Sequence, residues 1–231
     1  MDVQHLIVTR DLYFSYSGAA PYVLSGVSLE IRDGEYVSVV GDNGSGKTTL
    51  IKLMLKLLRP TRGAVRTSAG RIGYVPQKAD AAGSGFPITV YEMLNAYRRL
   101  LGIRDRSAVE RALEKVGMSE HRASLMGRLS GGQHQKTLIA RAIMGNPDLL
   151  ILDEPSTGVD AASQGDIYGI IKRQNADEGM TIVSVEHNLQ AAMSNSSLIY
   201  HLAGGHVHVC TPAQYAEEYL NISDGEGKAD A

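Results

Sequence analysis

Residues 41–48 carry the residue types and the spacing needed to hold phosphate groups. They read Gly-Asp-Asn-Gly-Ser-Gly-Lys-Thr and fit the pattern G-x-x-x-x-G-K-[ST]. Glycines let the backbone curl so that its N–H groups point at phosphate oxygens. Lys47 adds a mobile positive charge for the outer phosphates, and Thr48 offers a hydroxyl to Mg²⁺. We therefore predict an ATP and Mg²⁺ site whose nucleotide contacts are Gly41, Asn43, Gly44, Ser45, Gly46, Lys47, Thr48 and Thr49.

An acidic pair, Asp153 and Glu154, follows the four apolar residues 149–152. A buried strand that ends in carboxylates places them at the carboxyl edge of a sheet, where phosphate loops also lie. Asp153 then suits Mg²⁺ bound through water, and Glu154 suits a general base that polarises an attacking water. The alternative is an ordinary strand end before the turn at Pro155. The phosphate loop upstream favours the catalytic interpretation, so we predict ATP hydrolysis.

The phosphate loop needs a strand before it and a helix after it, and the sequence predicts both. Residues 36–40 form a short β-branched run, and residues 48–58 follow at helical period. Alternating residues at 12–17 and 22–31 indicate an antiparallel hairpin or meander. Further strands are expected at 71–75, 149–152 and 181–185, and helices within 89–127 and at 130–145.

This pattern predicts an α/β fold, a phosphate-loop NTPase core with an N-terminal antiparallel β subdomain and a helical insertion. We expect one domain over residues 1–222, with the helical subdomain inserted at about 78–145. Residues 223–231 are small and polar, and we expect them to be a disordered tail.

A second anion site is predicted at Ser130, Gly131 and Gly132, because serine is a good N-cap and the glycines bare N–H groups at a helix start. One nucleotide does not need two such sites from one chain. The sequence therefore favours a head-to-tail homodimer, in which each ATP lies between the phosphate loop of one copy and residues 130–132 of the other.

The run Leu129-Ser130-Gly131-Gly132-Gln133 resembles the signature sequence of ATP-binding-cassette (ABC) ATPases, and the resemblance covers about residues 3–220. It implies the ABC ATPase fold, and it adds Gln133 to the residues that meet the nucleotide of the second copy. It also implies roles for four residues: adenine stacking by Tyr16, sensing of Mg²⁺ and the attacking water by Gln77, contact across the dimer by Asp160, and contact with the γ-phosphate by His187.

Four positions depart from the family pattern. His134 and Lys136, in the signature helix, stand where other residues and an arginine are frequent. Asp42 stands where proline is frequent, and Glu186 stands before the histidine where serine or threonine is usual. Both add negative charge near a phosphate site without removing a group that the chemistry needs.

The resemblance implies a subunit that powers a membrane transporter. No stretch reaches the roughly 18 apolar residues of a membrane span, so we expect membrane-spanning permease subunits to hold the chain at the cytoplasmic face of the membrane. An extracytoplasmic substrate-binding protein is implied as a further partner. Phe86, Pro87 and Ile88 either contact the permease or cap the core of the insertion.

Residues 153–160 and 204–215 are most similar to the corresponding segments of ATPases from zinc and manganese uptake systems. The interpretations left open are export, a different substrate, a soluble ABC ATPase that acts on nucleic acid or ribosomes, and a nucleotide-gated dimerisation module. The net charge of −2 and the absence of tryptophan argue against a nucleic-acid partner. Intact Lys47, Glu154 and His187 argue against a module that does not hydrolyse ATP.

The C-terminal region predicts a β-hairpin, in which residues 198–202 pair with 207–210 across Gly204-Gly205. This register places His201 opposite His208, with His206 and Cys210 on the same face. Three imidazoles and a thiol are candidate zinc ligands. The alternative is the polar outer face of a terminal hairpin. Cys210 is the one cysteine of the sequence, so no disulfide can form within it.

Overall fold

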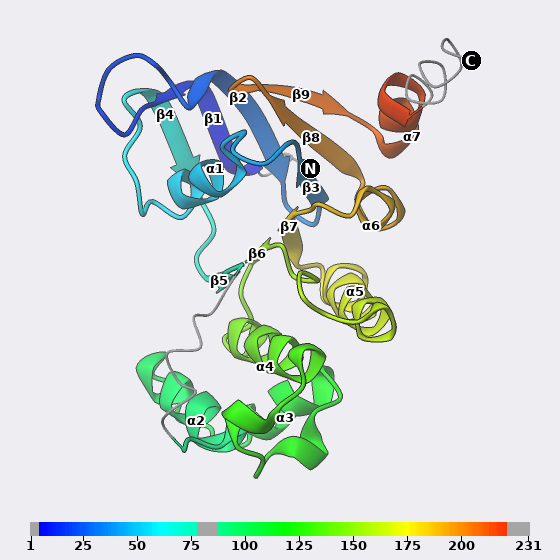
Figure 1. Ribbon diagram of the computed structural model, residues 1–231. Coiled ribbons are helices and arrows are strands. Elements are labelled where there is room, and N and C mark those ends of the chain that lie inside the picture. Colours follow the sequence, from blue (N-terminus) through cyan, green and yellow to red (C-terminus); the bar gives the residue numbers. More distant parts are fainter. Residues whose placement is uncertain (1–4, 78–86, 221–231) are drawn as a thin grey trace, which may run out of the picture. The chain divides into compact units, whose positions relative to one another are not determined.

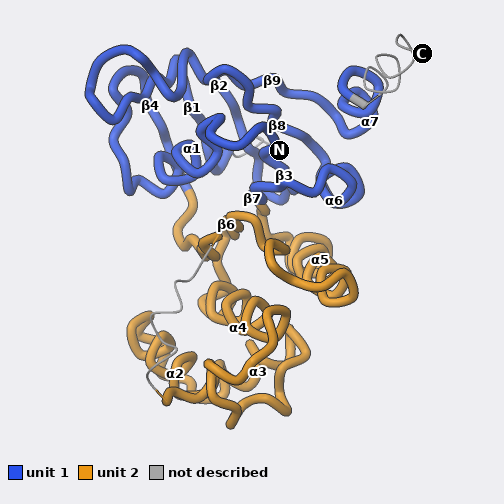
Figure 2. The backbone as a smooth tube through the Cα atoms, in the orientation of Figure 1, with its two compact units in different colours: residues 1–68, 183–231 blue, residues 69–182 orange. Residues whose placement is uncertain are grey.

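The computed structural model describes residues 5–77 and 87–220 (Figure 1). The chain divides into two compact units, shown in Figure 2. Unit 1 comprises residues 1–68 and 183–231, and unit 2 comprises residues 69–182. Within the described ranges, none of the helices has the length and apolar character that crossing a membrane requires.

The N-terminal part of unit 1 is the predicted antiparallel sheet. Strand β1 (His5–Phe14) pairs with β2 (Leu24–Arg32) on one side and with β4 (Arg62–Thr67) on the other. Alternate residues of β1 and β2, such as Leu12 and Val27, are fully buried, which explains the alternation in the sequence. The first strand ends at Phe14, earlier than the predicted residue 17, because a turn begins at Ser15.

The second part of unit 1 surrounds the phosphate loop. Strand β3 (Tyr36–Val40) is buried throughout and leads to helix α1 (Lys47–Met54). Strand β8 (Leu198–Ala203) runs parallel to β3, and β9 (His206–Cys210) returns antiparallel to β8. The unit also contains α6 (Leu189–Asn195), α7 (Pro212–Tyr215) and the π-helix η3 (Ala216–Leu220). Helices α6 and α7 are labelled in Figure 1.

Helix α1 ends at Met54, four residues before the predicted end at 58. Lys56 has a φ of 59°, in the left-handed region. The N–H of Leu57 donates to the carbonyl of Lys52, and the N–H of Lys56 donates to the carbonyl of Leu53. This pair of bonds is a Schellman motif, which closes the helix before its apolar run is finished.

Unit 2 contains the strands β5 (Ile72–Val75) and β6 (Leu149–Asp153), which pair in parallel. Gly73 on β5 is required by packing, because a Cβ there would lie 2.6 Å from the carbonyl oxygen of Ala142. The helices and turns of the unit are α2 (Val90–Leu100), α3 (Ala108–Lys115), η1 (Ser119–His121), η2 (Met126–Arg128), α4 (Gly131–Ile143) and α5 (Ala161–Ala176). Strand β7 (Thr181–Val185) includes residues of both units.

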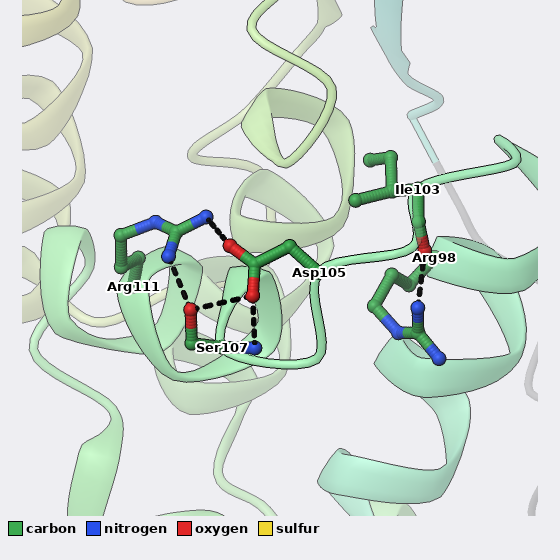
Figure 3. A network of polar contacts seen from close by, with 5 residues as sticks. All are labelled: Arg98, Ile103, Asp105, Ser107 and Arg111. Carbon is green, nitrogen blue, oxygen red and sulfur yellow. Dashed lines mark hydrogen bonds and ion pairs between the residues drawn. The ribbon is translucent and has the colours of Figure 1, made fainter.

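Polar contacts fix the loop between α2 and α3 (Figure 3). The buried guanidinium of Arg98 donates to the side chain of Asn95 at 2.9 Å and to the carbonyl of Ile103. Asp105 accepts from Arg111 at 2.6 Å and from the backbone N–H of Ser107 at 2.9 Å. The pKa of the Asp105 carboxyl is lowered to about 2, chiefly by the bond from Arg111 and then by the bonds from Ser107. The insertion is therefore held by charge-assisted bonds at its surface as well as by its apolar core.

Of the predicted permease contacts, Phe86 lies outside the described residues, as does the predicted tail at 223–231. Pro87 is exposed, and the carbonyl of Ile88 accepts from the N–H of Met126 at 2.9 Å.

Candidate nucleotide site

The phosphate loop connects β3 to α1 through left-handed glycines. Gly41 and Gly46 have φ values of 146° and 104°. A Cβ on Gly41 would lie 2.2 Å from the carbonyl oxygen of Leu202, so a side chain there would displace β8. Gly46 is the N-cap of α1 and offers no side-chain bond to the first turn. The strand before the loop and the helix after it are present as predicted, and the N-terminus of the helix has no side-chain cap.

Lys47 is 6% exposed and folds back over its own loop. Its Nζ donates to the carbonyl oxygens of Gly41 at 2.7 Å and Asp42 at 2.8 Å. These bonds keep the ammonium group at the mouth of the loop. A phosphate oxygen that replaced one of these neutral acceptors would give a stronger, charge-assisted bond.

Tyr16 lies beside the start of α1. Its hydroxyl is 3.0 Å from the hydroxyl oxygen of Thr49, and its ring stands edge-on to that of Phe14 at 4.9 Å. The side chain is otherwise open, with 67% of its surface exposed. An exposed ring that is fixed to the loop at its hydroxyl end suits stacking on a nucleotide base.

His187 also lies near the phosphate loop within unit 1. The N–H of Glu186 donates to the carbonyl of Val39 at 3.0 Å, which places this segment beside the end of β3. Glu186 and His187 line a cavity of about 270 Å³, together with Asp42, His201 and Tyr215. The carboxylate of Glu186 is buried and accepts from the hydroxyl of Ser184. The chain thus gathers Tyr16, the loop and His187 in one unit.

The acidic pair and Gln77 come together in unit 2. Val75 of β5 pairs with Leu152 of β6, so Gln77 and Asp153 follow at the same carboxyl edge of two parallel strands. Asp153 and Glu154 are 1% and 8% exposed. Burial, and then the negative charge of Asp153, raises the pKa of the Tyr74 phenol. A buried carboxylate at this edge is the kind of hard oxygen ligand that Mg²⁺ prefers.

Glu154 has a backbone conformation that side chains rarely adopt, with a φ of 54°. The hydroxyl of Thr157 donates to Glu154 Oε2 at 3.0 Å, and the N–H of Thr157 donates to the Glu154 carbonyl at 3.2 Å. Left-handed backbone at a non-glycine residue costs about 1–3 kcal/mol and persists where the surroundings hold it. Thr157 was not predicted as a functional residue from the sequence. The available signal was its position three residues after the carboxylate of Glu154.

The signature segment forms the predicted helix start. Ser130 is the N-cap of α4, and it forms a capping box with Gln133. Gly132 has a further reason to be glycine, since a Cβ would lie 2.6 Å from the side chain of Ser163 on α5. Asp160, the N-cap of α5, accepts from the N–H of Ser163 at 3.0 Å, and this bond lowers the pKa of its carboxyl. The structure thus packs the start of α4 against the start of α5.

Gly132→Ala is expected to destabilise the protein by about 1–3 kcal/mol, the usual effect of overpacking, because the added methyl group must displace Ser163. Gly165→Ala on α5 is the matched control. No atom lies within 4 Å of a Cβ at Gly165, so we expect it to stabilise the helix by about 0.5–1 kcal/mol. Urea unfolding of both variants measures the difference. Equal stability of the two would contradict the close packing at Gly132.

The hairpin at the end of unit 1 has the predicted register, with His201 opposite His208. The predicted zinc site at His201, His206, His208 and Cys210 is not formed. Among the described residues, no group of three or more His, Cys, Asp or Glu side chains is arranged to hold a metal ion.

Helices α7 and η3 explain this outcome, because they pack on the hairpin. The ring of His201 stands edge-on to those of Tyr215 at 5.6 Å and Tyr219 at 4.4 Å. His208 Nε2 lies 3.1 Å from a carboxylate oxygen of Glu218. Cys210 is buried in the core beneath them, and burial raises the pKa of its thiol.

The family model "ABC transporter" matches residues 24–157. The chain is 48% identical to a "Probable metal transport system ATP-binding protein" of Treponema pallidum (strain Nichols), over 96% of this chain and 93% of that protein. It is 41% identical to the "High-affinity zinc uptake system ATP-binding protein ZnuC" of Bacillus subtilis (strain 168), over 79% of this chain and 84% of that protein.

Solved structures agree on the fold. A structure described as a dimeric, post-hydrolysis state of the ATP-binding cassette MJ0796 bound to ADP and Pi matches with a TM-score of 0.74 and 25% identity, over 89% of this chain and 98% of that one. CbiO1 from Clostridium perfringens matches with a TM-score of 0.82 and 23% identity, over 97% of this chain and 95% of that one. The predicted α/β fold is confirmed, and the chain belongs to the ABC transporter family as an ATP-binding cassette ATPase.

Proposed function

We propose that this chain is the ATP-hydrolysing subunit of an importer for a divalent metal, zinc or manganese. The observation that carries the hydrolytic role is the buried pair Asp153 and Glu154, with Glu154 held in a left-handed conformation and bonded to Thr157. The metal substrate is supported by the two relatives described above, which are named for metal transport and zinc uptake.

In the proposed mechanism, Lys47 and the loop N–H groups bind the β- and γ-phosphates of ATP. Glu154 accepts a proton from the water that attacks the γ-phosphorus, while Gln77 and His187 orient that water. Tyr16 stacks on the adenine ring. Thr48, Asp153 and Gln77 supply oxygen donors of the kind that suits Mg²⁺, which would neutralise phosphate charge when bound.

A second copy of the chain completes the proposed site. Ser130, Gly131, Gly132 and Gln133 lie at the start of helix α4, where Ser130 and Gly131 are exposed. The N–H groups of this helix start suit the γ-phosphate of ATP held by the partner. Asp160 lies in the segment that packs beside this helix start. The dimeric cassette structure among the matches supports this arrangement. Hydrolysis would remove the charge that links the copies, and the dimer would reopen.

The proposed partners are membrane-spanning permease subunits and an extracytoplasmic substrate-binding protein. The permease would hold the chain as a peripheral subunit at the cytoplasmic face of the membrane. The exposed Pro87, at the start of the insertion, belongs to the proposed contact surface.

The test is transport by the reconstituted complex. The tagged chain is purified from its own cell membranes with whatever subunits accompany it, and the complex is placed in lipid vesicles. We expect ATP-dependent uptake of radioactive zinc or manganese, and no uptake when the complex carries Glu154→Gln. ATP hydrolysis without movement of either metal would contradict the metal assignment, and efflux would contradict import.

A further inference from the structure

Gln133, the third residue of helix α4, is held at both ends of its side-chain amide. The Oε1 of Gln133 accepts from the backbone N–H of Ser130 at 3.0 Å. The backbone N–H of Gln133 donates in turn to the hydroxyl of Ser130 at 3.2 Å. Its Nε2 lies 3.1 Å from Nε2 of His121, at the end of the short helix η1. The backbone of Ser130 is therefore connected to an imidazole twelve residues upstream of Gln133.

The direction of the bond between Gln133 and His121 follows from what each atom can do. Because Oε1 of Gln133 must face the N–H of Ser130, the amide NH₂ group must face His121. An amide NH₂ group donates and does not accept. Nε2 of His121 must therefore accept through its lone pair, which requires a neutral ring that carries its proton on Nδ1.

We infer that His121 is a positioning residue for the signature segment. The neutral imidazole fixes the amide of Gln133, and the amide fixes the backbone of Ser130. Protonation of His121 places a second donor against the amide NH₂ group and releases both residues. The inference rests on the proposed function in one respect, namely that Ser130 faces the ATP bound by the second copy.

Several of the ionisable groups on η1, α3 and the residue after η1 have partners of their own. Arg122 lies 3.4 Å from a carboxylate oxygen of Glu110 on α3, and its guanidinium lies 4.0 Å from the ring of Tyr91. His134 on α4 is half-buried, and burial, followed by the charge of Arg141, lowers its pKa. The remaining ionisable groups on η1 and α3 are Glu120, Arg111, Glu114 and Lys115, of which Arg111 pairs with Asp105 and Lys115 with Glu178.

The first experiment compares ATP hydrolysis by three variants between pH 5.5 and 8.5. His121→Gln keeps an acceptor oxygen that does not titrate in this range, whereas His121→Leu removes the acceptor. His206→Gln, at an exposed histidine on β9, is the matched control. A protonated imidazole cannot accept from the amide, so the bond and the activity that depends on it are present at high pH and lost as the pH falls.

At pH 8.5 we expect His121→Leu to lower kcat by about 3- to 10-fold, the range of one hydrogen bond, and His121→Gln to retain activity. At pH 5.5 we expect the kcat of wild type and of the His206→Gln control to be lower than that of His121→Gln by a similar factor. Identical pH profiles for wild type, His121→Gln and His121→Leu would overturn the inference.

The second experiment does not depend on ATP hydrolysis. Long-range ¹H–¹⁵N NMR spectra of the nucleotide-free protein with ¹⁵N-labelled histidine report which ring nitrogen carries the proton. We expect Nδ1–H for His121 at pH 8, and faster exchange of the Ser130 amide in His121→Leu but not in His121→Gln. A proton on Nε2, or unchanged exchange in His121→Leu, would overturn the inference. A wild-type chain that lacks ATPase activity but meets these expectations would instead contradict the proposed function.

Discussion

Glu154→Gln is expected to bind ATP as tightly as wild type and to lower kcat by about 10²- to 10⁴-fold, the usual contribution of a general base. The amide has the shape of the carboxylate but cannot take a proton from water. The bond from the Thr157 hydroxyl to Glu154 Oε2 can still form with the amide oxygen, so we expect the buried side chain to keep its place. Phosphate release and equilibrium binding of a fluorescent ATP analogue measure the two effects separately.

Glu178→Gln is the control for this change. Glu178 is an exposed carboxylate in unit 2 that pairs with Lys115, so the same chemical substitution there leaves the site intact. Turnover by Glu154→Gln within about tenfold of wild type would fall below the usual contribution of a general base and would contradict the assignment.

Lys47→Ala is expected to raise the Kd for ATP by about 100-fold, or roughly 3 kcal/mol, which is typical for the loss of a charged partner. The substitution removes the ammonium group and also its bonds to the carbonyls of Gly41 and Asp42, which help to hold the loop in shape. Isothermal titration with ATP and Mg²⁺ measures the change.

Lys52→Ala provides the comparison for Lys47, because both lysines lie on α1 and Lys52 is in its last turn. We expect the Kd for ATP of Lys52→Ala to stay within about twofold of wild type, since a partly exposed charge outside the loop contributes little to binding. Equal affinities for the two variants would show that α1 lysines act only through the general charge of the protein.

The fold around the phosphate loop could be predicted from sequence because its signals are local. A β-branched run, a glycine-rich loop and a helical period follow one another within residues 36–54, and the structure gives β3 and α1 there. Strand β4 and helix α5 gave weaker signals. β4 is partly exposed without a clear alternation, and α5 contains Gly165 and Gly169 among mixed polar and apolar residues.

The hairpin separates what local pattern determines from what packing determines. A two-residue glycine loop fixes the register, so His201 opposite His208 could be predicted. The fate of those side chains depends on Tyr215 and Tyr219, whose helices follow the hairpin and pack on His201. In the same way, the left-handed backbone of Glu154 and the contact of His121 with Gln133 arise from tertiary structure and leave no periodic signal.

The burial of Cys210 has a practical consequence for studies of motion. A thiol that is 4% exposed, with a raised pKa, reacts slowly with maleimide and iodoacetamide reagents. The sequence contains no other cysteine. A single cysteine introduced at an open position, such as Gly165, would therefore carry a fluorophore or spin label with little background, and the native residue would not need to be removed.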